Sequence, residues 1–260
     1  MLALNYSLYD CFAEKSFQGH AAVVVELPKK LEHDLTAKIA AELCQTVTCF
    51  VWEENDQILV ESLTKDGSIW SVNHGLLSVA KHCAKKQDKF VLHTVGDFFE
   101  VKVNGDIVSI SVPKQYLEFT EMPERLNQAF EIMPVSVREI GKTCVVELRT
   151  VEEIINLEAD FNRIAKLDYD RVVLTAEDDA APFDYVYRYF SPKHCVNENN
   201  GSLYVQTFLP LFWGERLKRD SFSFAQLGPR RAIGKVFIDE KFVQVEASVK
   251  KVFEGVLKVL

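Results

Sequence analysis

Apolar runs of strand length alternate with a helical pattern along the first half of the chain. Residues 21–27 and 47–53 read "AAVVVEL" and "VTCFVWE", and continuous apolar runs of this length are typical of buried strands. Residues 57–64 predict a further strand. Between the first two runs, residues 31–45 place leucine or isoleucine at every fourth position, so this segment is expected to form an amphipathic helix.

The next segment predicts a helix of a different kind. Residues 76–84 are apolar around much of the helix circumference, which indicates a helix that is buried on most sides. Residues 99–112 then alternate around Asn104 and Gly105, a pair that suits the type I′ turn of a hairpin. A curved sheet wrapped around the apolar helix satisfies both patterns.

The same order of elements returns in the second half of the chain. A strand is expected at 144–148, an amphipathic helix at 151–167, an apolar helix that begins near Gly201, and a strand pair after it. Two halves with one order predict an α+β protein of two similar domains. Each domain is expected to be a β-barrel-like sheet wrapped around a central helix.

The domain limits follow from this repeat. The first domain is expected at 1–113, with the segment 248–260 as a candidate to complete it, and the second at 141–247. Prolines are spaced along the intervening residues, which is typical of connecting segments. Residues 114–140 are therefore expected to form a linker region.

Polar and flexible residues stand at the start of each apolar helix. They are Asn73, His74 and Gly75 in the first half, and Gly201 and Ser202 in the second. Unpaired N–H groups at a helix start, together with the helix dipole, favour a bound anion. The two segments therefore predict the halves of a carboxylate site. Simple capping by the Asn and Ser side chains explains the same residues, and both interpretations stay open.

Charge and cysteine usage narrow the class of protein. The 260 residues carry a formal net charge of −8, which repels phosphate backbones and anionic lipid, so neither nucleic acid nor a membrane is an expected partner. The first residues lack the basic and apolar regions of a signal peptide. The six cysteines form no C-x-x-C pair, which favours free thiols in a reducing cytoplasm. The histidines do not cluster with them, so no metal site is expected.

Longer motifs carry a resemblance to a known family. The segments "YDCFAEKSFQGHAAVVV" and "AAELCQTVTCFV" resemble D-x-F-T-x-x-x-F-x-G-N-P-A-A-V and A-x-E-x-N-x-S-E-T-A-F-V. The stretch with "VNHGLLSVAKH" is similar to one ending in C-G-H-A-T-L-A. "VYRYFSPKHCVNENNGS" resembles R-x-F-A-P…E-D-P-x-T-G-S, and "AQLGPRRA" resembles Q-x-S-P-R-G-G. In this order, over nearly the whole chain, they resemble the PhzF family of phenazine biosynthesis-like proteins, which are related in fold to diaminopimelate epimerase.

The resemblance implies both a fold and a chemistry. It implies two barrel domains, often assembled as a homodimer, with a cleft that holds a small carboxylic acid. It also implies an isomerisation without a cofactor, in which a proton leaves one carbon and returns to another. In the family, the Glu of S-E-T-A-F shuttles this proton, the His of G-H-A and the Asp of E-D-P assist, and helix starts bind the substrate carboxylate.

This chain departs from the family pattern at the central residue. Val47 occupies the position of the family Glu, and Thr46 and Thr48 flank it as candidate substrate-binding residues. Valine carries no proton at any pH, whereas general acid–base transfer contributes about 10²–10⁴-fold to a rate. A different residue therefore has to act as the acid or base in any isomerisation.

Two residues are candidates for that role. His74 is retained, and it is either a proton donor or carboxylate ligand near neutral pH or a helix-start histidine bonded to backbone. The family Asp falls on Asn197 without a gap or on Glu198 with one. Glu198 against an apolar wall would have a raised pKa suited to proton transfer, and the alternative is an exposed loop glutamate.

Other residues of the expected site also differ from the family pattern. Asn73 stands in place of the family Gly, Gly75 in place of Ala, and Arg231 in place of Gly. Arg231 either fills the cleft, pairs with an anionic ligand or faces solvent. With Gly201 and Ser202, these residues complete the candidate substrate-binding set.

Two functions remain open from the sequence. The first is a PhzF-like isomerase or epimerase that acts on a small carboxylic acid and uses His74 or Glu198 in place of the missing Glu. The second is a catalytically silent PhzF-fold protein that binds a small anion or serves as an interaction protein.

Overall fold

The computed structural model describes residues 2–84, 88–180, 182–194 and 196–259. Cys195, which the sequence predicts to be a free thiol, lies outside the described residues. The chain divides into two compact units. Unit 1 comprises Met1–Val112, Gly201–Tyr204 and Gln244–Leu260, and unit 2 comprises Pro113–Asn200 and Val205–Val243. The domain limits expected from the sequence stay a prediction.

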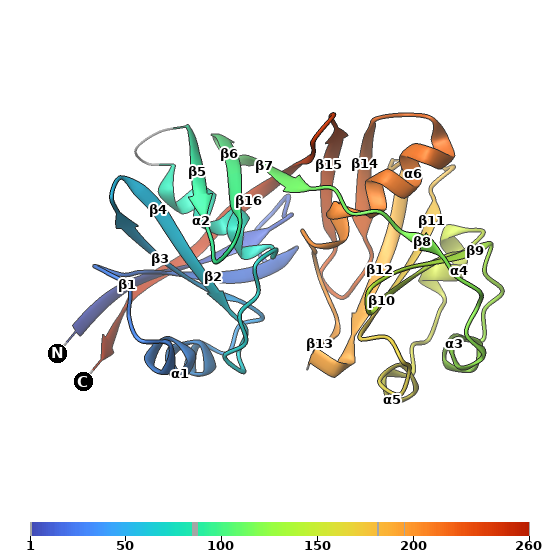
Figure 1. Cartoon of the computed structure of the whole chain (residues 1–260), viewed down its shortest axis with the longest axis horizontal. Helices are drawn as coiled ribbons and strands as arrows, with labels where there is room; N and C mark the ends of the chain where they lie inside the picture. The colour runs from blue at the N-terminus through green and yellow to red at the C-terminus, as the bar shows by residue number, and fades with distance from the viewer. Residues whose placement is uncertain (1, 85–87, 181, 195, 260) are drawn as a thin grey trace. The chain divides into compact units, whose positions relative to one another are not determined.

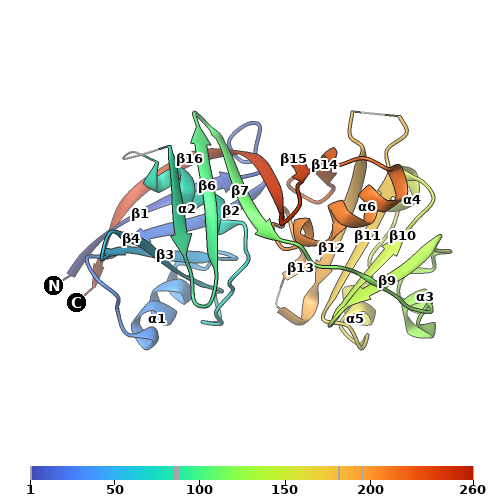
Figure 2. The same cartoon turned by 45° about the horizontal axis from the view of Figure 1, so that its top comes forward.

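Unit 1 is a sheet that closes on itself around a helix (Figures 1 and 2). Its strands are β1 (Leu2–Cys11), β2 (His20–Glu26), β3 (Thr48–Glu54), β4 (Gln57–Leu63), β5 (Lys89–His93), β6 (Phe98–Asn104), β7 (Ile107–Pro113) and β16 (Phe242–Val259). They pair in that order, and β16 also pairs with β1, from Leu2 opposite Val259 to Cys11 opposite Val249. Because β16 bonds to both β7 and β1, the sheet has the closed arrangement of a barrel.

Two helices occupy opposite faces of this sheet. Helix α2 (Gly75–Cys83) contacts β1, β2, β3 and β6, and its apolar residues Leu76, Leu77, Val79 and Ala80 are fully buried. Helix α1 (His33–Leu43) packs on the other face, where Ile39 and Ala40 join a core with Phe50 and Trp52. The predicted all-round apolar helix is therefore the centre of the barrel, and the predicted amphipathic helix covers it from outside.

Unit 2 contains a second sheet with helices against it. Its strands are β8 (Glu118–Phe119), β9 (Ser136–Ile140), β10 (Thr143–Glu147), β11 (Arg171–Glu177), β12 (Tyr185–Ser191), β13 (Val196–Glu198), β14 (Ser221–Gln226) and β15 (Ala232–Ile238). Their order is β15-β14-β12-β11-β10-β9-β8, with β13 beside β12. The helices are α3 (Glu124–Phe130), α4 (Val151–Ile155), α5 (Phe161–Ile164) and α6 (Leu209–Leu217), with short 3₁₀ turns at Pro192–His194 and Val205–Thr207.

Alternate residues of β12 serve two different cores in unit 2. Val186 and Phe190 belong to one hydrophobic core with residues of α3, α4 and α5. Tyr185 instead stacks against Trp213 of α6 at 5.9 Å between ring centroids, and against Phe224 of β14. The strand period of two therefore separates the helices on the two faces. The α+β fold with barrel-like sheets around helices, which the sequence predicts, is confirmed.

Two helix predictions in the second half are corrected by the structure. The expected helix 151–167 is divided into α4 and α5, because Asp160 interrupts it as a new N-cap that accepts hydrogen bonds from the N–H groups of Asn162 and Arg163. The apolar helix expected near Gly201 begins at Leu209, after a 3₁₀ turn. Pro210 lies in the first turn of α6, where no N–H is needed.

The segment 114–140 is more than a connector. It contributes β8, α3 and β9 to unit 2, and Leu126 and Val137 are buried in the core of that unit. The prolines that suggested a linker lie beside these elements: Pro123 is the N-cap of α3. Proline spacing alone did not separate a linker from a segment of short elements.

Candidate functional site

The start of α2 holds several of the predicted site residues, and the side chain of Asn73 bonds to its first N–H group. Asn73 is fully buried, its Oδ1 accepts a hydrogen bond from the Gly75 N–H at 2.8 Å, and its Nδ2 donates to the Trp70 carbonyl at 2.5 Å. The next two N–H groups, of Leu76 and Leu77, donate to the carbonyls of Asn73 and His74. Since these first donors are used within the chain, the structure favours capping over an anion site here.

The position of the missing Glu is filled by tight packing. Val47 and Cys49 are fully buried and face Gly75. A Cβ added at Gly75 would lie 2.8 Å from Asn73 Oδ1 and 3.0 Å from Val47 Cγ1, and nearer still to Cys49 Sγ. Glycine at 75 is therefore required by the residues now at 47 and 49. The flanking Thr48 is buried with no hydrogen-bond partner for its Oγ1 among the described residues, and Thr46 is half-buried.

His74 is held in one tautomer beside a second histidine. Its Nε2 lies 3.0 Å from the Ala21 carbonyl oxygen, and because a carbonyl only accepts, Nε2 carries the hydrogen. Nδ1 is then a buried acceptor, and no described residue bonds to it. The ring stacks on His20, with centroids 3.7 Å apart and 9° between the planes. Burial, with a further contribution from His20, holds the pKa of His74 well below 6.5, so the imidazole is neutral at pH 7.

His20 is a residue of this site that the sequence reasoning missed. It begins β2, its side chain is buried, and its Nδ1 donates to the Gly201 carbonyl at 2.7 Å. The signal was present in the motif "FQGHAAV", where His20 stands at the Asn of the family's G-N-P. Gly201 and Ser202 are buried and do not begin a helix, so their predicted role at a helix start is wrong.

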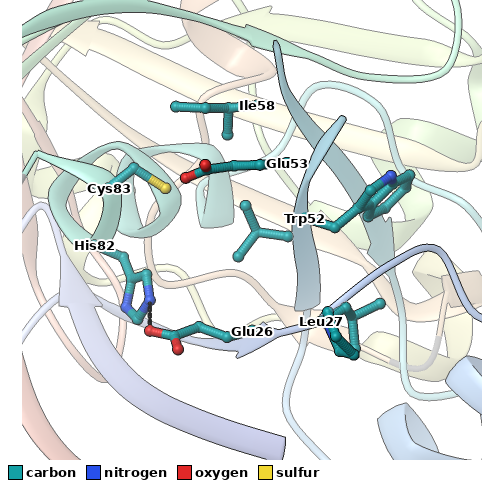
Figure 3. Close-up of a pocket in the computed structure, with 9 residues that line it drawn as sticks. Glu26, Leu27, Trp52, Glu53, Ile58, His82 and Cys83 are labelled. Carbon is teal, nitrogen blue, oxygen red and sulfur yellow. Dashed lines mark hydrogen bonds and ion pairs between the residues drawn. The ribbon is translucent and has the colours of Figure 1, made fainter. Parts of the chain in front are cut away.

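The opposite end of α2 opens on a cavity of about 390 Å³ (Figure 3). His82, in the last turn of the helix, places Nε2 2.6 Å from Glu26 Oε1 and Nδ1 2.9 Å from the Tyr9 hydroxyl. Burial raises the pKa of Tyr9 to about 12, so its O–H is retained at pH 7. When a neutral His82 donates its Nε2–H to the Glu26 carboxylate, its Nδ1 accepts from this O–H. Glu53, Cys83 and the apolar side chain of Ile58 also line the cavity.

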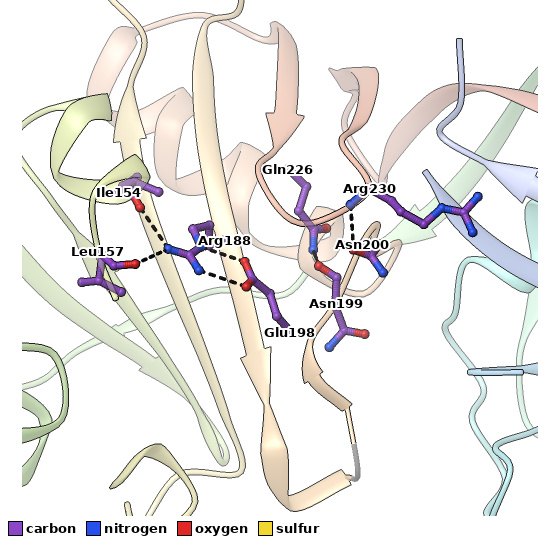
Figure 4. A network of polar contacts seen from close by, with 8 residues as sticks. All are labelled: Ile154, Leu157, Arg188, Glu198, Asn199, Asn200, Gln226 and Arg230. Carbon is purple, nitrogen blue, oxygen red and sulfur yellow. Dashed lines mark hydrogen bonds and ion pairs between the residues drawn. The ribbon is translucent and has the colours of Figure 1, made fainter. Parts of the chain in front are cut away.

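In unit 2, the predicted carboxylate is neutralised by an arginine (Figure 4). Arg188 Nε and Nη2 donate to the two oxygens of Glu198 at 2.7 and 2.9 Å. Its Nη1 donates to the carbonyls of Ile154 and Leu157 at 3.1 and 2.8 Å. The Glu198 side chain is only 9% exposed, so both of its oxygens serve a buried, bidentate ion pair. The alternative position Asn197 is exposed.

The loop after Glu198 is fixed by backbone contacts. Gln226 Nε2 donates to the Asn199 carbonyl, and the Arg230 N–H donates to Asn200 Oδ1 at 3.2 Å. Arg231 is exposed and lies over the Phe183 ring at 4.9 Å. With Arg188 and Glu198, it lines a cavity of about 400 Å³ in unit 2. The sequence predicts Glu198 and Arg231 in one site together with His74, which stays a prediction, and it does not predict the role of Arg188.

The described residues include no group of three or more His, Cys, Asp or Glu side chains arranged to hold a metal ion. Within the same part of the chain, no helix has both the length and the apolar character needed to cross a membrane.

Known proteins resemble this chain over most of its length. It is 28% identical over 226 residues to an uncharacterized isomerase of Pseudomonas aeruginosa, with 85% of this chain and 86% of the relative covered. It is 23% identical over 262 residues to a phenazine biosynthesis-like domain-containing protein of Bos taurus, with 86% and 88% covered. No model of a known protein family matches the sequence.

A solved structure extends the likeness to the fold. The crystal structure of a PhzF-family phenazine biosynthesis protein of Enterococcus faecalis superposes with a TM-score of 0.92 at 22% identity, over 99% of this chain and 100% of that one. The resemblance to the PhzF family predicted from the motifs is therefore confirmed, and the fold of the chain is PhzF-like.

Proposed function

We propose that this chain is an isomerase that moves a proton between two carbons of a small carboxylic acid without a cofactor, and that His74 acts as its base. The name of the Pseudomonas relative supports the isomerase class. The single observation that carries the proposal is the buried Nδ1 of His74, which is unpartnered among the described residues. A buried acceptor of this kind is costly unless a ligand uses it.

The geometry suits a base more than an acid. The bond from Nε2 to the Ala21 carbonyl fixes the tautomer, so Nδ1 offers a lone pair. Because the pKa of His74 lies well below 6.5, this lone pair is available across the physiological pH range. Nδ1 takes the proton from one substrate carbon, and the same Nδ1–H returns it to another carbon, so the ring ends neutral.

Glu198 is not part of this proposal. Its carboxylate is already paired with Arg188 on both oxygens, and breaking a buried pair is costly. Glu198 and Arg188 instead fix β13 against β12 and the end of α4.

A solvent-exchange assay tests the proposal. The protein in D₂O is mixed with small amino and hydroxy acids, and deuterium incorporation at carbon is followed by NMR. His74→Gln is expected to lower the exchange rate by about 10²-fold or more. The matched control is His33→Gln, because His33 is exposed, and this variant is expected to leave the exchange rate unchanged. An exchange rate that survives His74→Gln would overturn the assignment.

A second function is favoured by one specific observation. Val47, Cys49 and Gly75 interlock at the position of the family Glu, which fits a catalytically silent protein that binds a small anion. In that case the wild-type chain shows no exchange with any acid, while equilibrium dialysis still detects a bound carboxylate. Homodimer assembly and a cytoplasmic location also stay predictions, and sedimentation analysis tests the first.

A further inference from the structure

We infer that His20 is a positioning residue for His74, which it clamps face to face so that the Nδ1 lone pair keeps one direction. The inference rests on the proposed function for the role of His74, but the geometry of the pair is independent of any activity. No single local motif contains both residues, because they lie 54 positions apart, on β2 and at the start of α2.

Each ring is anchored at one nitrogen by a carbonyl. His20 Nδ1 donates to the Gly201 carbonyl at 2.7 Å, and His74 Nε2 donates to the Ala21 carbonyl at 3.0 Å. The ring planes are within 9° of parallel, and both side chains are buried. Trp70 meets His74 edge-on, with centroids 6.3 Å apart. Rotation of His74 about χ2 would break its carbonyl bond and the stack together, so the direction of Nδ1 is set by three contacts.

The stack also restricts protonation. A proton on one ring would lie above the other ring at a centroid distance of 3.7 Å, so the pair resists a second positive charge. His20 is one of the causes that lower the pKa of His74, after burial itself. A base that stays neutral at pH 7 is the state that proton abstraction requires.

The other groups near His74 do not supply a compensating charge. From β1, the Cys11 thiol donates to the His74 carbonyl, and from β3 the Cys49 thiol faces Asn73. Burial raises the pKa of both thiols to about 12, so both are neutral at pH 7. Asp10 on β1 accepts the Phe17 N–H at 2.6 Å, and the pKa shift of His74 arises from burial, His20 and the Ala21 carbonyl without a contribution from Asp10. The buried residues of β6 are apolar: Phe99, Val101 and Val103.

Two substitutions at position 20 separate stacking from charge. His20→Phe keeps an aromatic face against His74 but loses the proton site and the bond to Gly201. His20→Asn removes the ring and restores the residue of the family motif. Removal of the neighbouring imidazole is expected to raise the pKa of His74 in both variants. Only His20→Asn also removes the stack, so only in this variant can the His74 ring turn away from the Ala21 carbonyl and lose its fixed tautomer.

Ring ¹⁵N NMR across a pH titration measures both effects, with exposed His33 as the internal control in each spectrum. In the wild type we expect His74 to remain the Nε2–H tautomer, neutral at pH 7. Upward movement of its titration midpoint in both variants, with mixed tautomers in His20→Asn, supports the inference. Unchanged titration and tautomer of His74 in both variants overturns it.

The exchange assay then distinguishes this inference from the proposed function. His20→Asn is expected to lower the exchange rate by about 10-fold to 10²-fold, and the acid limb of the pH–rate profile should follow the NMR midpoint of His74. If the NMR shifts occur but the wild type exchanges no substrate proton, the clamp is correct and the proposed function is wrong. If exchange depends on His74 but neither readout responds to position 20, the clamp is wrong and the proposed function stands.

Discussion

Two buried histidines lie at the two ends of α2, and they differ in their hydrogen bonds. His82 has a partner on each ring nitrogen, Glu26 on one side and Tyr9 on the other. His74 has the Ala21 carbonyl on one nitrogen and, among the described residues, none on the other. Since buried polar groups are nearly always paired, the fully bonded end of the helix serves the fold, and the incompletely bonded end is the place to look for chemistry.

The largest expected effect concerns access to the start of α2. Burial raises the pKa of Cys11 and Cys49 from an ordinary 9.0 to about 12, which lowers the thiolate fraction at neutral pH about 10³-fold. Iodoacetamide at pH 7 is expected to modify the exposed Cys44 at least about 10³-fold faster than either buried thiol. Site-resolved mass spectrometry measures the three rates in one sample.

Cys11 is the informative residue in that experiment, because its thiol donates to the His74 carbonyl. Cys144, buried in unit 2 with a pKa also raised to about 12, is the matched control. Rapid modification of Cys11 while Cys144 stays protected would show that the start of α2 opens in solution, contrary to the buried geometry described above.

The second effect is a contrast in stability between the two histidines. His82→Gln removes the buried imidazole that bonds to both Tyr9 and Glu26, and this is expected to lower the free energy of unfolding by about 1–3 kcal/mol. His74→Gln removes a single bond and is expected to cost about 1 kcal/mol. Urea denaturation of both variants measures the difference. The exchange rate should show the reverse order, with the larger loss in His74→Gln. If the two variants lose equal stability and equal exchange rate, the two ends of α2 do not differ in role.

The smallest effect concerns a surface contact beside His82. Lys81 Nζ lies 2.8 Å from Asp106 Oδ1, and Lys250 Nζ lies 2.7 Å from Oδ2. Hydrogen bonds from Lys250 and Lys81 lower the pKa of Asp106. A carboxyl with a lowered folded-state pKa stabilises the fold above its unfolded-state pKa, and that contribution is lost as the pH falls through the folded-state value.

Lys81→Met is therefore expected to cost up to about 1 kcal/mol at pH 7, and less at an acid pH below the lowered folded-state pKa of Asp106, where the carboxyl is neutral. Urea denaturation at the two pH values measures both differences. Lys38→Met, which removes an exposed pair with Asp34 on α1, is the matched control with a smaller cost. Lys81 Nζ also donates to the Gly105 carbonyl at 2.5 Å. A cost for Lys81→Met that is the same at both pH values would assign the cost to this bond instead.

The elements of unit 1 were largely predictable from periodicity, and those of unit 2 were less so. Strands β2, β3 and β4 and helices α1 and α2 match the apolar patterns because burial on one or both faces dictates those patterns. The division of α4 from α5 was missed because it depends on one cap, Asp160, inside a sequence that still reads as helix. The later start of α6 was missed because Gly201 and Ser202, followed by an apolar run, look like a helix start in the sequence, whereas a 3₁₀ turn at Val205–Thr207 precedes the helix.

The candidate site shows the same limit. The alignment located Val47 and His74 because each belongs to a local motif. It did not locate His20 beside His74, nor Arg188 beside Glu198, since these contacts depend on how strands pair. Glu198 looked like an available acid when only its own segment was read. Its arginine lies on the preceding strand, ten residues earlier.

The position of strand β16 at the end of the chain's strand order has a consequence for folding during synthesis. It bonds to β7 and to β1, and it pairs Val259 with Leu2, yet it leaves the ribosome after every other strand of unit 1. The barrel therefore stays open, with two unpaired edges, throughout the synthesis of unit 2. Closure then joins residues more than 250 positions apart, a contact whose entropic cost slows folding. A nascent chain halted before residue 242 should expose those edges to chaperones. A circular permutant that links residue 259 to residue 2 should fold faster, because β1 and β16 are then neighbours in the sequence.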